Sequence, residues 1–232
     1  ARSITVPGRK PLTAGGITML KVSGLDVNIG PTPILRGLAL EVPAGTMCGL
    51  IGRNGAGKTT FLRAIMGALA AEAGEAMFGH QDLLKIHPHK RAHMGIGFMP
   101  EDRRLVPALT AEENILVPVW ATGMEDWEDR LAWIYELMPE VAEFRSRGAM
   151  ELSGGQQKFV AFARALMVGT QLLLLDEPSE GIAPVFAQRM SEIMKSLKDE
   201  GESVLVAESN DKHVAGLLDR TFVIERGSIV SD

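Results

Sequence analysis

One short glycine-rich stretch, residues 52–60, restricts the possible folds of this chain more than any other feature. An apolar run, Met47–Ile51, precedes it, and a helix-forming run over residues 61–66 follows it. A loop that joins a buried strand to a helix in this way is typical of a phosphate-binding loop. Its glycines let successive backbone N–H groups point at phosphate oxygens, and the helix start adds partial positive charge. The predicted nucleotide-binding residues here are Gly52, Asn54, Gly55, Ala56, Gly57, Lys58, Thr59 and Thr60.

Two side chains of the loop have distinct expected roles. Lys58 is expected to reach the outer phosphates of a nucleoside triphosphate, and the Thr59 hydroxyl is expected to coordinate Mg²⁺. The alternative is an ordinary glycine-rich turn that matches the pattern by chance. The strand and the helix on either side of the loop favour the first interpretation.

Length and composition limit the remaining possibilities. The 232 residues suffice for one large α/β domain with an insertion, and such a domain buries a core without disulfides. A net charge of −5 and the lack of a long Lys/Arg cluster argue against a nucleic-acid partner. The single cysteine, Cys48, is expected to be a core residue in a reducing compartment. Residues 1–16 hold no continuous apolar segment, so we expect a flexible N-terminal arm and not a signal peptide.

The order of predicted elements indicates the fold class. Short β-type runs between residues 17 and 42 predict a small antiparallel sheet ahead of the loop. A helical insertion is expected over about residues 105–165, with a capping box from Thr110 to Glu113. Strands and helices then alternate, which predicts a parallel core sheet. The expected elements are strands at 172–176 and 203–207, helices at 184–200 and 211–218, and a hairpin over 221–230.

The polar segment over residues 80–93 contains four of the five histidines. A metal site is one interpretation, but no carboxylate or cysteine joins these histidines at a ligand spacing. We therefore expect a solvated surface segment.

Two further stretches point to chemistry. Four leucines are followed by Asp176 and Glu177. At the end of a buried strand, Asp176 could hold Mg²⁺ through its water shell, and Glu177 could polarise a water for attack on the γ-phosphate. The alternative is two acids that merely end a strand. The second stretch, residues 152–157, has one serine and two glycines before a helix expected from Lys158, and it forms either a second anion-binding helix start or an ordinary one.

The order of the loop, the residue 152–157 motif and the Asp176-Glu177 pair resembles that of the ATP-binding cassette family, over about residues 19–230. The resemblance implies an α/β P-loop NTPase core, an N-terminal antiparallel β subdomain and an inserted α-helical subdomain, together covering residues 17–232. It implies ATP and Mg²⁺ as ligands. It also implies a head-to-tail pair of ATPase subunits that drives transmembrane permeases. In such a pair, the signature residues of one subunit contact the ATP of the other, and here they are Ser153, Gly154, Gly155 and Gln156.

Residues 99–104 and 176–184 narrow the resemblance to ATPases of branched-chain amino acid importers and their relatives for amides and urea. This chain is most similar to the second, shorter ATPase of such a pair. The resemblance implies a place on the cytoplasmic face of the bacterial inner membrane, with two permeases, a second ATPase and, indirectly, a periplasmic solute-binding protein. No apolar run approaches the length of a membrane span, so any link to a membrane has to run through a partner.

Four positions differ from the usual family pattern. Ile29 occupies the place of an aromatic residue that stacks on adenine. Loss of this stacking is expected to remove on the order of 0.5–1.5 kcal/mol from the free energy of nucleotide binding, beyond the effect of buried area. Glu101 replaces a glutamine that senses the γ-phosphate, and we expect its carboxylate to bridge to Mg²⁺ or water. Ala183 replaces an aspartate. Ser209 replaces a histidine, and it can donate a hydrogen bond but cannot carry positive charge. Glu101 and Ser209 therefore join Glu177 as candidate catalytic residues.

Three functions are compatible with these motifs. The leading one is the ATP-hydrolysing subunit of an importer for branched-chain amino acids or similar small polar solutes. The second is a weakly catalytic or non-catalytic nucleotide-binding partner in a heteromeric transporter, suggested by Ile29 and Ser209. The third is a soluble cassette ATPase without a transport role, against which the acidic charge and the single cassette argue.

Overall fold

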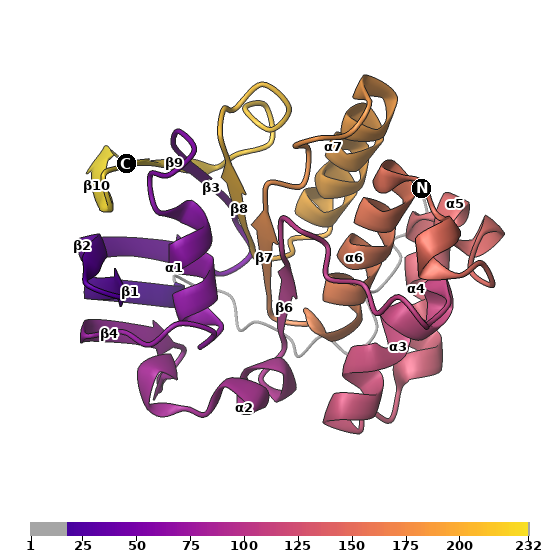
Figure 1. The fold of residues 1–232 in the computed structure, drawn as a ribbon, viewed down its shortest axis with the longest axis horizontal. Helices are drawn as coiled ribbons and strands as arrows, with labels where there is room; N and C mark the ends of the chain where they lie inside the picture. The colour runs from indigo at the N-terminus through magenta and orange to yellow at the C-terminus, as the bar shows by residue number, and fades with distance from the viewer. Residues whose placement is uncertain (1–17, 232) are drawn as a thin grey trace.

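Two β-sheets and a group of helices make up residues 18–231, which are the residues that the computed structural model describes (Figure 1). The first sheet is antiparallel, in the order β2-β1-β4-β5. The second has the order β10-β9-β3-β8-β7-β6, and all its strands are parallel except β10. The arm expected at residues 1–16 lies outside the described residues. The α/β fold class is confirmed.

The antiparallel sheet consists of β1 (Thr18–Ile29), β2 (Thr32–Pro43), β4 (Ala73–Phe78) and β5 (Gln81–Asp82). The sequence predicts separate runs before and after Gly24, but they form one strand whose register shifts between Val22 and Leu25. Gly24 has a φ of 61°, a left-handed conformation that glycine adopts without a steric penalty. The buried side chains of the sheet, such as Leu20, pack with Phe61 in one hydrophobic cluster.

The core sheet consists of β3 (Met47–Ile51), β6 (Ile96–Met99), β7 (Leu172–Asp176), β8 (Val204–Glu208), β9 (Arg220–Glu225) and β10 (Ser228–Ser231). Every residue of β7 and β8 is buried. This burial explains their continuous apolar runs, because helices or the other sheet cover both faces of a parallel sheet. The carboxyl ends of β3 and β7 meet at one edge, and the two predicted site motifs follow these strands.

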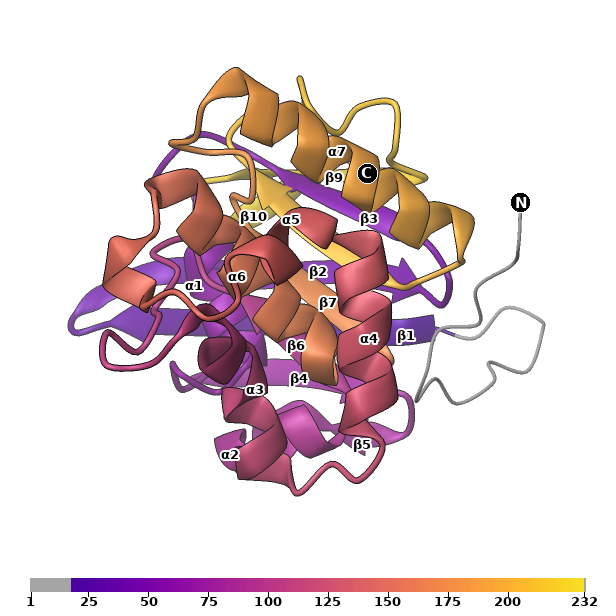
Figure 2. The same cartoon turned by 90° about the vertical axis from the view of Figure 1, so that its right-hand side faces the viewer.

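Helices lie between and beside the sheets (Figure 1). Helix α1 (Lys58–Ile65) packs between the two sheets, and α7 (Pro184–Asp199) covers the other face of the core sheet. Figure 2 shows the group formed by α3 (Ala111–Thr122), α4 (Trp127–Leu137), α5 (Pro139–Glu143) and α6 (Gly154–Val168). The shorter elements are α2 (Pro88–His93) and two 3-10 turns, Leu83–Lys85 and Ala149–Glu151. No helix within residues 18–231 is long and apolar enough to cross a bilayer.

The prediction of a helix over residues 211–218 is wrong, because the structure has consecutive turns there. The amides of Val214 and Ala215 both donate to the Asp211 carbonyl, at 2.9 and 2.7 Å. Two side chains of α7 donate hydrogen bonds to further carbonyl oxygens of this segment: Ser191 to His213 O, and Lys198 to Leu217 O. In a short segment that contains Gly216, helix nucleation is unfavourable and few internal hydrogen bonds offset it. The tertiary contacts with α7 therefore determine the conformation.

The four histidines of residues 80–93 are exposed, as predicted for a solvated segment. Arg91 of the same segment is an exception, because only 3% of it is exposed. Its guanidinium donates to the carbonyls of Ala64 and Leu83, at 2.9 and 2.7 Å, and thereby ties α2 to the end of α1. Arg91 is therefore a buried structural residue within a polar stretch.

Candidate functional site

The glycine-rich loop curves from the end of β3 into α1. Gly55 and Gly57 have φ angles of 81° and 116°, a region that side chains with a Cβ rarely adopt. A Cβ on Gly57 would lie 2.8 Å from the Leu35 side chain, which would have to shift to make room for it. The loop is held by two main-chain hydrogen bonds: Gly52 N donates to Glu208 O at 3.2 Å, and Gly227 N donates to Ala56 O at 2.9 Å.

Lys58 is the first residue of α1, and only 4% of it is exposed. Its ammonium donates to the carbonyl oxygens of Gly52, at 2.6 Å, and Arg53, at 3.2 Å. The same nitrogen lies 3.0 Å from Glu177 Oε1. The loop lysine and the acid after β7, predicted separately from the sequence, therefore form an ion pair, and both line one cavity of about 320 Å³ together with Thr59 and Glu101.

Asp176 ends β7 and is completely buried. Thr59 Oγ1 donates to Asp176 Oδ1 at 3.2 Å, whereas Oδ2 is buried without a hydrogen-bond partner. Desolvation by burial raises the pKa of Asp176 to about 6. The nearby Glu101 and Glu177 carboxylates raise this pKa further, whereas the hydrogen bond from Thr59 lowers it. A buried carboxylate with an unused oxygen next to a threonine hydroxyl fits a hard divalent cation.

No three His, Cys, Asp or Glu side chains within residues 18–231 gather as a self-contained metal site. A magnesium ion here therefore needs oxygen ligands from a nucleotide or from water besides Thr59 and Asp176. Glu101 follows β6 and is exposed, and it lines both the loop cavity and a neighbouring one that reaches Asp176.

Glu177 begins a turn with an unusual backbone, because its φ is 47° although it is not a glycine. Its amide donates to Ala207 O at 2.9 Å. Two buried ionisable residues that the sequence analysis did not identify hold the turn. The Lys158 ammonium donates to the carbonyl oxygens of Glu177 and Glu180, the latter at 2.5 Å, and the Glu208 carboxylate accepts the Ser179 amide at 3.0 Å.

Burial perturbs both residues. Desolvation lowers the pKa of Lys158 and raises the pKa of Glu208 to about 7, while the Ser179 hydrogen bonds and Lys158 oppose the second shift. The sequence offers one signal for each. Lys158 directly precedes the apolar residues 159–163 of α6, and Glu208 ends an otherwise apolar strand.

Ser209 lines a cavity of about 480 Å³ on the other side of the loop, together with residues 52–56. Its hydroxyl donates to Glu180 Oε2 at 3.3 Å. Ile29, the candidate adenine contact, is 48% exposed at the end of β1 and does not line the loop cavity. Ile34, which the sequence analysis did not identify, does line it.

The signature residues lie elsewhere. Ser153 caps α6, since its hydroxyl accepts the Gln156 amide at 3.3 Å and the Gln156 side chain accepts the Ser153 amide at 2.9 Å. This capping box starts the helix at Gly154, before the expected start at Lys158. Ser153 and Gly154 are exposed, and none of residues 153–156 lines the loop cavity. The structure therefore groups the loop with Glu101, Asp176 and Glu177, and leaves the signature residues on a separate surface.

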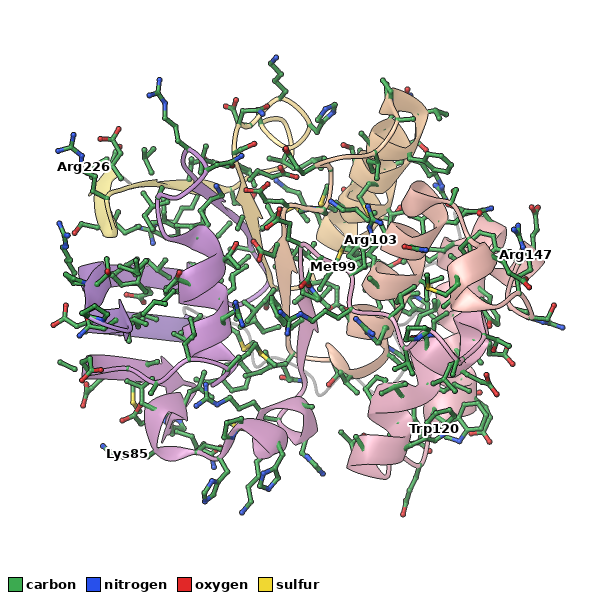
Figure 3. The ribbon with its side chains drawn as sticks, viewed as in Figure 1. Lys85, Met99, Arg103, Trp120, Arg147 and Arg226 are labelled. Carbon is green, nitrogen blue, oxygen red and sulfur yellow. The ribbon has the colours of Figure 1, made fainter. Side chains whose placement is uncertain are left out.

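Arg103 connects that surface to the segment that carries Glu101. Arg103 lies between the core sheet and the helical group (Figure 3), and its Nη1 donates to Gln157 Oε1 at 3.2 Å. Arg103 and Arg104 have φ angles of 62° and 48°. The Arg164 guanidinium of α6 donates to both of their carbonyl oxygens and stabilises this left-handed pair.

Comparison with known proteins gives consistent matches. The family model described as ABC transporter matches residues 35–180. The high-affinity branched-chain amino acid transport ATP-binding protein BraG of Pseudomonas aeruginosa is 35% identical over 212 residues, which cover 91% of both chains. The lipopolysaccharide export system ATP-binding protein LptB of Escherichia coli is 29% identical over 200 residues, or 85% of this chain and 83% of LptB.

A solved structure extends the similarity to three dimensions. The ADP conformation of MJ1267, an ATP-binding cassette of an ABC transporter, superposes with a TM-score of 0.78. It is 28% identical in sequence, and the match covers 93% of this chain and 90% of MJ1267.

Proposed function

The chain belongs to the ATP-binding cassette family of ABC transporters, and we propose that it powers uptake of branched-chain amino acids or related small polar solutes. It is an ATPase of this family and a transporter ATP-binding subunit. One observation carries the proposal for its site: Lys58, Thr59, Glu101 and Glu177 line one cavity at the glycine-rich loop.

Each residue has a role that follows from its chemistry. The loop amides and the α1 N-terminus bind phosphate oxygens, and Lys58 contacts the outermost phosphate. Glu177 accepts a hydrogen bond from the attacking water and orients it, and Glu101 holds a second water or shares the cation. Ser209 donates a hydrogen bond on the other side of the loop. The proposed adenine contact stays with Ile29, with Ile34 beside the phosphates.

Thr59 and Asp176 are the proposed protein ligands of magnesium, directly or through water. When bound, the ion neutralises charge that develops on the phosphate oxygens. The unpartnered Oδ2 of buried Asp176 supports this assignment. Ionisation of Asp176, whose pKa is raised to about 6, is required for the role and is favoured by the cation's charge.

We further propose that the chain works as one half of an ATPase pair, with either a second copy or an unlike cassette. The exposed Ser153 and Gly154 at the start of α6 support this assembly, because they lie outside the cavity of their own loop. In the pair, residues 153–156 contact the nucleotide bound to the other subunit.

Permeases are the proposed second partners. A cavity of about 560 Å³ lies between α1, β6 and α2 on one side and α3 and α6 on the other. Met66, Phe98 and Val117 give it apolar walls, and it reaches Thr59 and Asp176 of the proposed site. A permease segment in this cavity would contact the segment that carries Glu101. This arrangement implies a peripheral place on the cytoplasmic face of the bacterial inner membrane, with a periplasmic solute-binding protein as an indirect partner.

The proposed base has a direct test. Glu177→Gln keeps the side-chain shape but removes the charge, so ATP binding should persist while hydrolysis falls by roughly 100-fold or more. ATP affinity and single-turnover hydrolysis of the purified full chain measure the two effects. Glu192→Gln on the exposed side of α7 is the matched control and should behave as the unmodified chain. Normal hydrolysis by Glu177→Gln would refute the assignment.

The solute and the direction of transport have a separate test. Cells that lack the gene should lose uptake of labelled leucine, isoleucine or valine, and the original gene should restore it while the Glu177→Gln gene should not. Parallel assays with labelled urea and acetamide distinguish the related importers. Unchanged uptake of all these solutes, with lipopolysaccharide accumulating inside the cell, would instead indicate an export role like that of LptB.

A further inference from the structure

Lys158 is an unusual residue for its position. It is 2% exposed, in the second turn of α6, and burial of a lysine ammonium costs free energy unless its donors are satisfied. Its ammonium donates to two main-chain carbonyl oxygens, those of Glu177 and Glu180. Both belong to the turn that follows β7. A residue that only packs α6 needs no charge there, so these contacts indicate a specific role.

The turn needs external support. Glu177 has a φ of 47°, which is strained for a residue with a Cβ and persists only where the surroundings enforce it. Within the turn, the Glu180 amide donates to Glu177 O at a long 3.2 Å. Lys158 binds the carbonyls at both ends of the turn, and Glu208 binds the Ser179 amide between them. The turn is therefore held from α6 on one side and from β8 on the other.

The backbone of Glu177 decides where its carboxylate lies. In the observed conformation Glu177 Oε1 is 3.0 Å from Lys58 Nζ, inside the loop cavity. Relaxation of φ to the ordinary right-handed region would redirect the side chain. A displacement of about 1 Å at a reacting group is enough to lower a rate by about 100-fold.

We propose that Lys158 is a positioning residue for ATP hydrolysis, which holds the Glu177 turn in its strained conformation from the signature helix α6. The inference rests on the proposed role of Glu177. It also gives α6 two functions at once. The helix starts with the signature residues proposed to contact the nucleotide on the other subunit, and one turn later it supports the base of its own site. A movement of α6 is then transmitted to Glu177 through Lys158.

Lys158→Met tests the proposal, because methionine fills the space and donates no hydrogen bond. In the full chain, kcat for ATP hydrolysis should fall by about 10- to 100-fold, while KM and ATP affinity stay within about twofold. Lys158→Arg keeps a cationic donor, so its kcat should stay within about threefold of the original. Lys195→Met, on an exposed lysine of α7, is the matched control and should leave kcat and KM unchanged.

A double variant separates positioning from general damage. In the Glu177→Gln background, Lys158→Met should lower the residual single-turnover rate by less than about twofold, because Lys158 acts through Glu177. An unchanged kcat in Lys158→Met would overturn the proposal. So would an equal loss in both backgrounds, or a loss of ATP affinity that matches the loss of kcat.

Two further outcomes are distinguishable. If Lys158→Met does not fold, Lys158→Gln retains a donor for one carbonyl, and its kcat and KM provide the same comparison. If Glu177→Gln hydrolyses ATP normally, the assignment of the base fails, whatever Lys158 does. If Glu177→Gln is inactive and Lys158→Met and Lys158→Gln are both fully active, only the positioning role fails.

Discussion

Replacing Glu208 by glutamine should change how the stability of the protein depends on pH. Glu208 ends β8 with 4% of its surface exposed, and desolvation by burial raises the pKa of its carboxyl from 4.5 to about 7. The carboxylate of nearby Glu177 raises it further, whereas the Ser179 hydrogen bonds and the Lys158 cation lower it. Glutamine keeps an oxygen that accepts the Ser179 amide and carries no charge at any pH.

The sign of the effect follows from proton binding. The folded chain holds the Glu208 proton more tightly than the unfolded chain does. The stabilisation from this group is therefore complete below pH 4.5 and is lost as pH rises through about 7. A pKa rise from 4.5 to about 7 corresponds to at most about 3 kcal/mol in the free energy of unfolding. Relative to the original chain, Glu208→Gln should thus gain up to about 3 kcal/mol between pH 4.5 and pH 8.

Urea unfolding at closely spaced pH values between 4.5 and 8 measures this difference. Titrating groups that do not interact with Glu208 contribute equally to both chains, so they cancel in the comparison. Glu75→Gln, which changes an exposed carboxyl on β4, is the control and should give a nearly constant difference. A Glu208→Gln curve parallel to the original would refute the reasoning. An opposite slope would show that attraction to Lys158 outweighs the cost of burying the carboxylate.

Two further substitutions test the local structure. Gly227→Ala should destabilise the protein by about 2–4 kcal/mol and weaken ATP binding, because φ is 85° and a Cβ would lie 1.9 Å from the Ile34 carbonyl oxygen. Gly216→Ala, where a Cβ meets nothing within 4 Å, is its control in thermal unfolding and ATP titration, and equal effects of the two would contradict the argument. Thr110→Ala should cost about 1 kcal/mol in urea unfolding, since Thr110 caps α3 through the Glu113 amide, and Thr110→Ser should retain most of that stability.

Features that depend on local pattern were predictable from the sequence. The apolar runs of β7 and β8 indicated buried parallel strands, because a parallel sheet is covered on both faces and buries every side chain of such a strand. The capping box at Thr110 predicted the start of α3. The loop, Asp176 and Glu177 converge because the carboxyl ends of parallel strands share one edge.

Features that depend on distant partners were not predictable. Residues 211–218 have helical periodicity, but Ser191 and Lys198 of α7 donate hydrogen bonds to two of their carbonyl oxygens, and the segment forms turns. Nothing local in the sequence marks Arg91 as buried, since its acceptors are carbonyls of α1 and of the 3-10 turn before α2. The apolar residues beside Lys158 suggest that it is buried, but its role was not predictable because its partners in the Glu177 turn lie on a different element.

The position of β3 in the core sheet has a consequence for folding. The strand that leads into the phosphate loop pairs Met47 with Val204 and Cys48 with Arg220, so both neighbours come from segments far along the chain. Pairing over such separations is slow, whereas helices close in sequence, such as α4 and α5, can associate early. During synthesis the loop is made early, yet its strand has no neighbour until β8 and β9 have left the ribosome. The nucleotide site is therefore expected to become ordered late in folding, after the helices that surround it.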